Sequence, residues 1–351
     1  MLIAHHLPQF HAIPENDEWW GKGFTDWVKV RNAKPLFAGH EQPRVPHPSL
    51  GEYDLSRIES LLIQWDLARR HGIEGFCYYH YWFDGKRLLQ RPVELARAWN
   101  GPEKLPYCLC WANEPWTRVW DGFDRQVLMP QSYGSEASWE AHFLYLEPFF
   151  ADTRYIRWHG CPLFLLYRAA SIPAAEQMIA CWQALARRRP GTDLAVVQMR
   201  TSFGWDTSRS SAYDATLCFE PMLSLWPETR AEKMADLAIR PRACGLRRGP
   251  HFFSFDRCWR KILSRRYGPH DWPGAFVGWD NTPRRGADGH VCLGGSPAKF
   301  GDGMRKLTTI AKANSVPFVF VNAWNEWAEG NYLEPDTILA YSYLKQLSSA
   351  K

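Results

Sequence analysis

Eight short apolar runs recur along this chain of 351 residues, separated by segments long enough to hold a helix. The runs are Leu2–Leu7, Ile73–Tyr79, Tyr107–Ala112, Pro162–Tyr167, Leu194–Met199, Ala215–Phe219, Ala275–Trp279 and Pro317–Asn322. They predict buried strands, and the intervening Leu55–His71 and Ala174–Arg188 have the apolar spacing of amphipathic helices. Strands that alternate with helices predict a parallel sheet, and eight repeats predict a closed (β/α)8 TIM barrel with long βα loops.

The length and the even composition of the chain predict a single domain over residues 1–351. A (β/α)8 barrel typically takes about 250 residues and tolerates insertions. Hydrophobic residues make up 46% of the chain, which is enough for one large core, and no linker or internal repeat interrupts the pattern. The segment between the fifth and sixth runs is short, which predicts a reduced or irregular helix there.

The composition argues against several classes of function. The net charge is +5 and the basic residues are dispersed, so a nucleic-acid partner is not expected. No apolar stretch approaches the roughly 20 residues of a transmembrane helix. The nine cysteines have no zinc-like spacing and no signal peptide precedes the first run, which together predict reduced thiols and a cytoplasmic location.

Polar and aromatic clusters follow five of the predicted strands, which is where (β/α)8 barrels build their active sites. The clusters are Pro8–His11, Tyr79–Trp82, Asn113–Trp116, Trp279–Asn281 and Asn325–Glu329. The agreement among separate segments predicts that these side chains meet at one end of the barrel. The chain also has 19 Trp and 14 Tyr, and aromatic faces of this kind stack on the C–H groups of sugars.

The last cluster holds two carboxylates, Glu326 and Glu329, which are the predicted catalytic pair. If the chain turns after Asn325, the two side chains converge, because positions i and i+3 share one face of a helical turn. Paired carboxylates beside aromatic side chains are suited to glycosidic bonds, since one holds a proton and the other acts as base or nucleophile. The alternative is two surface acids on the first turn of a helix.

The other polar and aromatic residues near the strand ends predict a substrate-binding set. It consists of His80, Tyr81, Asn113, Glu114, Trp116, Arg118, Trp120, Asp121, Trp279, Asp280, Asn322, Trp324 and Asn325. Structural alternatives stay open for three of its parts: a helix cap for Asn113 with Glu114, a core histidine for His80, and an internal ion pair for Arg118 with Asp121. No metal and no cofactor is expected, because the histidines lack ligand spacing and there is no glycine-rich phosphate loop.

Several longer motifs resemble the WbsX family of polysaccharide biosynthesis proteins, which is similar to glycoside hydrolase family 99. The motifs are Pro8–His11, Ile13–Asp17, Trp19–Thr25, Tyr79–Phe83, Ala112–Glu114, Trp120–Gly122 and Asn322–Gly330. The resemblance implies a (β/α)8 barrel and metal-free, retaining, endo-acting cleavage of α-mannosides. Glu326–Glu329 matches the family's E-W-H-E motif. By that match Glu326 would deprotonate the sugar 2-hydroxyl to give a 1,2-anhydro sugar, and Glu329 would be the general acid, then base. Independently, burial and the like charge of the neighbouring carboxyl predict a raised pKa for Glu329.

Three positions depart from the related sequences. His6 stands where they usually have Tyr, Val119 where they usually have a second Arg, and Ala328 where family 99 has His. The hypotheses are a retaining endo-glycoside hydrolase acting on an α-linked O-antigen or capsule-type polysaccharide, a glycosyltransferase of lipopolysaccharide O-antigen biosynthesis, and a non-catalytic glycan-binding barrel. The expected partner is an oligosaccharide or polysaccharide, with peripheral association with a polysaccharide assembly system.

Overall fold

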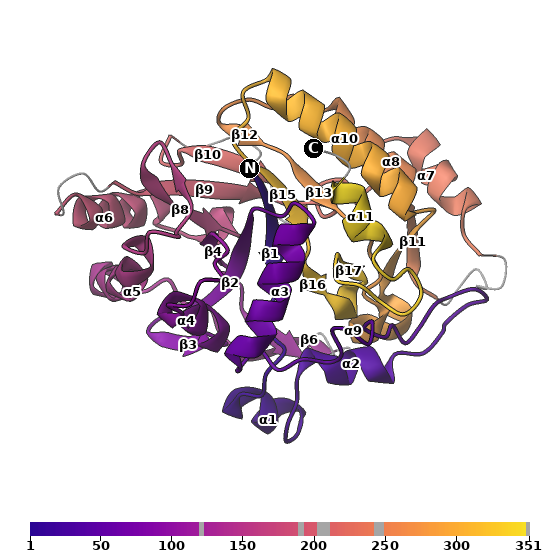
Figure 1. Cartoon of the computed structure of the whole chain (residues 1–351), viewed down its shortest axis with the longest axis horizontal. Helices are drawn as coiled ribbons and strands as arrows, with labels where there is room; N and C mark the ends of the chain where they lie inside the picture. Colours follow the sequence, from indigo (N-terminus) through magenta and orange to yellow (C-terminus); the bar gives the residue numbers. More distant parts are fainter. Residues whose placement is uncertain (119–122, 189–192, 202–210, 242–248, 349–351) are drawn as a thin grey trace.

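The computed structural model of the chain describes residues 1–118, 123–188, 193–201, 211–241 and 249–348 (Figure 1). Its central feature is a nearly closed barrel of parallel strands. The strands are β1 (Leu2–His6), β2 (Gly75–Phe83), β4 (Tyr107–Trp111), β8 (Cys161–Leu166), β9 (Ala195–Arg200), β10 (Ala215–Cys218), β12 (Asp271–Trp272), β13 (Gly274–Phe276) and β15 (Val319–Asn322). Their order is β12-β10-β9-β8-β4-β2-β1-β15-β13. Each predicted run overlaps a strand, and the predicted (β/α)8 class is confirmed.

The barrel closes through the segment that contains β12 and β13. β12 pairs with β10, with Thr216 opposite Asp271, while β13 pairs with β15, with Gly274 opposite Phe320. Pro273 separates the two short strands; it has no N–H to donate to a ladder, but its carbonyl accepts a bond from the Phe320 amide at 3.1 Å. A Cβ atom on Gly274 would come within 1.9 Å of the Cys218 carbonyl oxygen, so this seam requires glycine.

Helices surround the barrel and also cover one of its ends. They are α1 (Pro14–Trp20), α2 (Asp26–Asn32), α3 (Ile58–Arg70), α4 (Arg91–Ala98), α5 (Glu136–Phe150), α6 (Ala175–Arg187), α7 (Arg230–Ala238), α8 (Phe255–Ser264), α9 (Thr282–Arg285), α10 (Pro297–Ala313) and α11 (Ser342–Ser348). The predicted helices Leu55–His71 and Ala174–Arg188 correspond to α3 and α6. Most of the segment between β9 and β10, where a reduced helix is predicted, lies outside the described residues.

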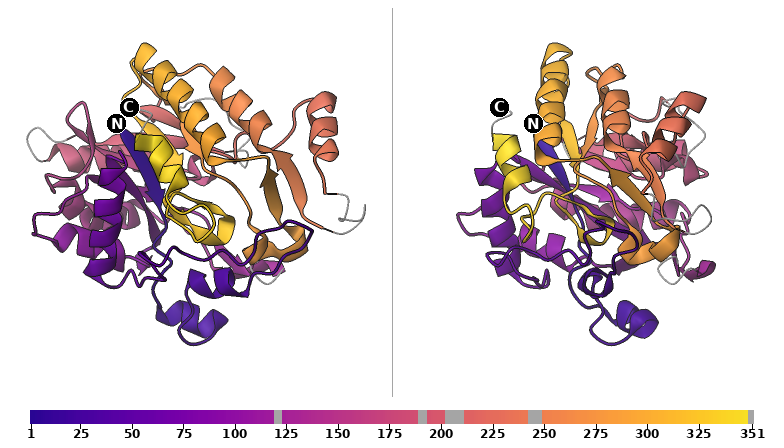
Figure 2. Two further views of the ribbon diagram at one scale, coloured as in Figure 1. Left: turned by 45° about the vertical axis from the view of Figure 1, so that its right-hand side comes forward. Right: turned by 90° about the vertical axis from the view of Figure 1, so that its right-hand side faces the viewer.

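Short strands and turns complete the described parts of the loops. They are β3 (Lys86–Leu88), β5 (Trp116–Arg118), β6 (Phe123–Met129), β7 (Arg157–Trp158), β11 (His251–Ser254), β14 (His290–Leu293), β16 (Asn325–Glu326) and β17 (Asn331–Tyr332), with single 3₁₀ turns at Ala169–Ser171, Gly286–Asp288 and Trp327–Glu329. Figures 1 and 2 show α1, α2 and α9 at the end of the barrel opposite to the two termini. That end is where β1, which starts at the N-terminus, finishes.

The strands have the burial expected for a sheet covered on both faces. β2 is buried along its whole length, and the core continues through the side chains of β4, β8 and β15. Among the residues that the structure describes, the cysteines are free thiols. None of the described helices is both long enough and apolar enough to cross a membrane.

Candidate active site

The carboxylate pair lies on a tight turn at the carboxyl end of β15. Glu326 ends β16, which pairs antiparallel with β17, and the 3₁₀ turn Trp327–Glu329 connects the two strands. Gly330 closes the turn in the left-handed region with φ of 58°, and a Cβ atom there would lie 2.8 Å from the Cβ of Asp280. Because a single 3₁₀ turn separates Glu326 from Glu329, their side chains face the same side.

One guanidinium group joins the two carboxylates. Arg284, in α9, donates from Nη1 to Glu329 Oε1 at 2.7 Å and from Nη2 to Glu326 Oε2 at 3.4 Å. Its Nη2 also donates to Asp26 Oδ2 at 3.1 Å, and Asp26 lies in α2. The Arg284 side chain is only 11% exposed. Three acids from distant parts of the chain are therefore held around one buried positive charge.

Burial raises the pKa of both members of the pair. The pKa of Glu326 is raised well above its usual value by burial and by the neighbouring Glu329, and Arg284 lowers it only in part. The pKa of Glu329 is raised by burial too, but Arg284 opposes the rise and lies closer to it. The closer guanidinium of Arg284 therefore favours the ionised form of Glu329 more than that of Glu326. The raised pKa predicted for Glu329 agrees with the direction found, and its role as the proton donor stays a prediction.

A second acid–base pair faces the same space. Glu114 follows β4, and its Oε2 lies 2.6 Å from Nη2 of Arg168, which follows β8. Desolvation raises the pKa of Glu114, while the charge and hydrogen bond of Arg168 lower it. This pair contributes a cation and an anion to the wall of the site, in side chains that are about one third exposed.

These groups line a cleft of about 620 Å³. Much of its lining is aromatic, from Trp20, Tyr79, Tyr81, Trp116, Tyr167, Phe219, Trp226 and Trp279. Polar atoms come from Gln9, Asn281, Arg285, His290 and Asn322, in addition to the charged residues above. A cleft of this size, with aromatic walls and a few convergent polar groups, has the character of a site for a small organic ligand.

Comparison with known proteins places the chain in a family. The family described as Glycosyltransferase WbsX matches residues 2–347. The chain belongs to the WbsX family. Relatives of this WbsX-family chain include two proteins from Xanthomonas campestris pv. campestris, described as uncharacterized protein WxcX. They come from strains B100 and ATCC 33913 and are each 37% identical over 98% of this chain. The chain spans about half of their length, at 48%.

Solved structures share the fold of the WbsX-family chain at low identity. One is the GH99 endo-alpha-mannosidase from Bacteroides thetaiotaomicron in complex with bis-tris-propane, with a TM-score of 0.61, 13% identity, and coverage of 99% of this chain and 95% of that one. Another is described as a glycoside hydrolase-like protein, with a TM-score of 0.62, 13% identity, and coverage of 99% and 93%. At this identity the likeness shows the barrel fold.

The structure brings part of the predicted site together. The predicted residues that line the cleft are Tyr81, Glu114, Trp116, Trp279, Asn322, Glu326 and Glu329. Arg118 is not among the lining residues; its guanidinium lies over the ring of Trp20, 5.9 Å from the centroid, and Trp20 does line the cleft. Trp120, Asp121 and the departure at Val119 lie outside the described residues.

His80 was predicted to bind substrate, and the structure places it away from the cleft. β2 continues to Phe83, and side chains alternate between the two faces of a strand. Tyr79 and Tyr81 therefore line the cleft, while His80 points to the helix side. There its Nε2 lies 2.9 Å from Nε2 of His142 in α5, and burial lowers the pKa of His80 to about 3. His80 is a core histidine.

Two asparagines predicted to contact substrate instead fix the backbone around the cleft. Asn113 accepts a bond from the Arg168 amide at 2.7 Å and donates to the Arg168 carbonyl at 2.9 Å. Asn325 makes the same kind of pair with Leu7, at 2.7 and 3.0 Å. Both side chains are fully buried and lie outside the cleft lining, so they position neighbouring cleft residues.

Asp280 and Trp324 are likewise buried away from the cleft. Asp280 Oδ2 accepts bonds from His40 Nε2 at 2.8 Å and Gln42 Nε2 at 2.6 Å, which holds the loop before α3 against α9. The fully buried Trp324 packs on Phe76, with a centroid distance of 5.1 Å. His6 and Ala328, which differ from the residues usual in related sequences, also lie in the interior. His6 Nε2 lies 2.9 Å from Gln64 Oε1, and Ala328 has no exposed surface.

Sequence reasoning missed several residues of the site. The most important are Arg284 in the cleft and its buried partner Asp26, followed by Arg168, Tyr167 and Trp226. A usable signal existed for two of them, because Tyr167 ends a predicted strand and Arg168 follows it directly, where active-site residues of barrels lie. Arg284 follows the Trp279–Asn281 cluster by a few residues. Asp26 lies in the segment Trp19–Trp27, whose composition fits a ligand-binding loop and a packed loop equally. No local pattern identifies Trp226.

Proposed function

We propose that this chain is a carbohydrate-active enzyme that cleaves an α-glycosidic bond in a cell-surface type of oligosaccharide or polysaccharide. Glu326 and Glu329 are the reacting carboxyls. The observation that carries the proposal is their convergence on Arg284 in an aromatic-lined cleft. Glycosidic cleavage needs one carboxyl that gives a proton and one that removes a proton or attacks, and two neighbouring carboxyls in unequal environments supply both roles. The resemblance to family 99 supports the same reading.

In the proposed reaction Glu326 removes the proton of the sugar 2-hydroxyl, and O2 attacks the anomeric carbon of its own ring. The bond between the anomeric carbon and the leaving oxygen breaks, and that oxygen takes the proton of Glu329. Glu329 then removes a proton from water, whose oxygen opens the 1,2-anhydro ring at the anomeric carbon, and O2 recovers its proton from Glu326. Two inversions at one carbon give overall retention, and both carboxyls return to their starting state.

This sequence requires Glu326 to be ionised and Glu329 to be protonated when the sugar is bound. The contacts among the protein groups favour the opposite arrangement, because Arg284 lies closer to Glu329 than to Glu326. A bound sugar that moves the guanidinium from Glu329 toward Glu326 reverses the order, since a nearby cation favours the ionised form of whichever carboxyl it contacts. Arg284 is thus proposed to set which carboxyl holds the shared proton.

Glycosyl transfer is the second candidate, because the matching family is described as a glycosyltransferase. The same two carboxyls serve transfer if an acceptor hydroxyl takes the place of water in the second half of the reaction. No nucleotide is needed for that exchange when the donor is itself a glycoside. Hydrolysis and transfer then differ only in what reaches the anhydro sugar.

The test uses a defined α-linked oligosaccharide, incubated with and without a nucleotide sugar and followed by mass spectrometry. Shortened products carrying one added water indicate hydrolysis, lengthened products indicate transfer, and an unchanged but bound oligosaccharide indicates a glycan-binding barrel. Glu326→Gln should slow turnover by about 10²–10⁴-fold. Glu329→Gln should do the same for natural leaving groups but spare activated aryl glycosides, which need no acid.

Glu59→Gln is the matched control, because Glu59 has a side chain that is 65% exposed and makes no contact with the cleft. It should retain the wild-type rate. Circular dichroism of each variant checks folding. Near wild-type turnover by folded Glu326→Gln or Glu329→Gln would disprove the catalytic assignment, and an equal loss of binding and turnover would favour a binding role.

A further inference from the structure

Among the cleft residues that have no part in the proposed chemistry, Trp226 is the most exposed tryptophan. Trp226 lies on the loop between β10 and α7, lines the cleft, and remains 50% exposed. Most of the other tryptophans in the described part of the chain are buried in the core. Trp226 differs from them because about half of its surface is exposed to solvent. An exposed indole beside a polar cleft is the usual means of binding the apolar face of a sugar ring.

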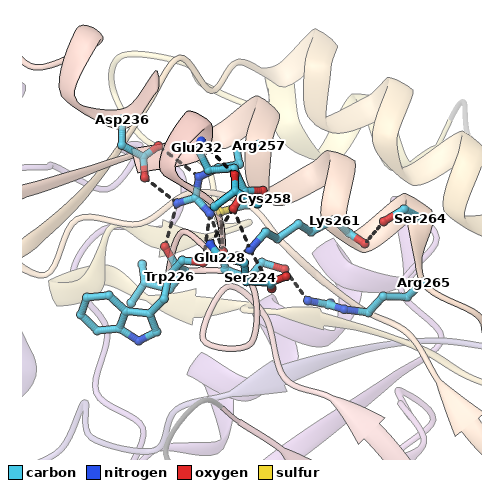
Figure 3. A network of polar contacts seen from close by, with 12 residues as sticks. Ser224, Trp226, Glu228, Glu232, Asp236, Arg257, Cys258, Lys261, Ser264 and Arg265 are labelled. Carbon is cyan, nitrogen blue, oxygen red and sulfur yellow. Dashed lines mark hydrogen bonds and ion pairs between the residues drawn. The ribbon is translucent and has the colours of Figure 1, made fainter. Parts of the chain in front are cut away.

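The backbone of this loop is held by buried cations, as Figure 3 shows. Arg257, in α8, donates to the carbonyls of Ser224 at 2.9 Å, Leu225 at 2.8 Å and Trp226 at 3.4 Å. Asp236 fixes the same guanidinium through bonds of 3.1 and 2.8 Å. Lys261 adds a bond to the Trp226 carbonyl at 2.9 Å. The loop position is therefore set by its main chain, and the indole projects away from the network.

The indole plane has a polar neighbour with unused hydrogen-bonding capacity. His290, in β14, meets the Trp226 ring edge-on, with a centroid distance of 5.4 Å and an angle of 87°. Its Nε2 is shielded from solvent and has no hydrogen-bond partner among the described residues. Burial lowers the pKa of His290 to about 4, assisted by His251 and Arg285. The ring is neutral near pH 7 and can exchange a hydrogen bond with a hydroxyl group.

The strand order places Trp226 and Trp116 on different sides of the carboxylate pair. Trp226 follows β10, the carboxylate pair follows β15, and Trp116 follows β4. Around the barrel, β12 and β13 lie between β10 and β15, while β1 and β2 lie between β15 and β4. The cleft therefore has an aromatic surface on each side of the carboxylate pair. A single sugar at Glu326 and Glu329 would leave Trp226 unoccupied.

We propose that Trp226 and His290 form a second sugar subsite, remote from the bond that is cleaved. It takes an uncharged pyranose ring, whose C–H face stacks on the indole and one of whose hydroxyls bonds His290 Nε2. The inference rests on the proposed function of the cleft and adds to it a requirement on substrate length. The preferred substrate extends beyond the reacting sugar toward β10, and a short glycoside cannot use this part of the cleft.

The experiment compares Trp226→Ala, Trp226→Phe and His290→Ala with the wild type. The probes are α-linked tetra- to hexasaccharides released from bacterial O-antigen polysaccharides and the corresponding methyl α-glycosides. Trp226→Ala should bind the oligosaccharides about 10–100-fold more weakly, raising KM with little change in kcat, because a stacking surface is lost. Trp226→Phe should lose less, and His290→Ala should fall between them. Binding of the methyl glycosides should not change in any of the three.

Met234→Ala is the matched control, because Met234 lies in the adjacent α7, is 64% exposed and does not line the cleft. A second readout does not need turnover: oxidation of Trp226 by N-bromosuccinimide, followed by peptide mass spectrometry, should be suppressed by the oligosaccharides and not by the methyl glycosides. Turnover of oligosaccharides by Trp226→Ala with unchanged KM would overturn the subsite and leave the proposed reaction intact. Protection of Trp226 without any turnover would retain the subsite and reject the reaction.

Discussion

Glu329 and Glu334 belong to one short segment after β15, yet their surroundings are opposite in kind. Glu329 is 21% exposed, faces the cleft and contacts the guanidinium of Arg284. Glu334 is 3% exposed and faces the core. It accepts three hydrogen bonds from neutral donors: Tyr53 Oη at 2.8 Å, Gln64 Nε2 at 2.8 Å and Trp327 Nε1 at 2.6 Å.

The difference shows how one residue type serves two purposes. The protonation of Glu329 depends on a cation and on the contents of an open cleft, so a ligand can change it. The protonation of Glu334 depends on fixed protein groups that no ligand reaches. Trp327, one of its donors, lies between Glu326 and Glu329 in the turn. The core carboxyl therefore holds in place the turn that carries the cleft carboxyls.

The largest expected effect comes from removing the cation on the cleft side. Arg284→Met leaves Asp26, Glu326 and Glu329 crowded without a positive partner, and uncompensated buried charge costs about 3–5 kcal/mol. The free energy of unfolding at pH 7, measured by urea denaturation, should therefore fall by about 3–5 kcal/mol. The loss should shrink on acidification, because carboxyls with raised folded-state pKa values stabilise the fold in their protonated form.

The neighbouring substitution Arg285→Met serves as its control, since Arg285 occupies the same helix but is not part of the carboxylate cluster. It should change the free energy of unfolding much less. If Arg284→Met and Arg285→Met unfold at the same urea concentration, Arg284 does not stabilise the three acids in the folded protein. The proposed difference between the cleft carboxyls and the core carboxyl Glu334 would then be wrong.

A somewhat smaller effect is expected on the core side. Glu334→Leu leaves three buried donors without an acceptor, at about 1–3 kcal/mol for each donor that cannot find another partner. Glu334→Gln keeps an oxygen for Tyr53 and Trp327, and Gln64 can turn its amide to face the new NH₂ group. The melting temperature of Glu334→Leu should be far below that of Glu334→Gln. Equal melting temperatures would show that the three bonds contribute nothing.

Comparison of the wild type with Glu334→Gln also tests how stability depends on pH. Burial raises the pKa of Glu334 to about 7, although its hydrogen bonds act against the rise. A folded-state pKa above the unfolded one stabilises the protein fully below the unfolded pKa, and this stability is lost as pH rises through the folded pKa. Between about pH 4.5 and 7 the wild type should therefore lose about 3 kcal/mol relative to Glu334→Gln. A constant difference between the two across that range would argue against the shift.

The smallest expected effect concerns Asp26. Its negative charge raises the pKa of both Glu326 and Glu329. Asp26→Asn should lower both values and move the acidic limb of the pH–rate profile to lower pH, with a fold of near wild-type stability. A profile unchanged in position would mean that Asp26 does not influence the cleft carboxyls.

Much of the barrel was predictable, because most of its strands are short buried runs and periodicity reports burial directly. The seventh strand was predicted over Ala275–Trp279, but the sheet begins earlier, at Asp271. Asp271 and Pro273 disguise the strand in the sequence. In the fold, the Asp271 carboxylate accepts a bond from Thr216 Oγ1 at 2.8 Å, and Pro273 occupies the break between β12 and β13.

The candidate site was predictable only where local chemistry was sufficient. Glu326 and Glu329 are close in sequence, and a turn is enough to bring them together. Their contact with Arg284 and Asp26 is set by the closed barrel, which no local window contains. His80 shows a different limit: which face of a strand meets the cleft depends on where the strand ends, and β2 ends later than its apolar run suggested.

Strands from the two ends of the sequence lie side by side in the barrel, so the barrel cannot be completed until late in synthesis. β1, near the start of the described chain, pairs with β15, with Leu2 opposite Val319, and the carboxylate turn is tied to the first strand through Leu7 and Asn325. A chain leaving the ribosome cannot form these contacts until residues beyond 325 have emerged. Such non-local pairing folds slowly and leaves apolar strand edges open meanwhile. A ribosome-bound chain stalled before β15 should thus bind chaperones and no sugar, however complete its other strands are.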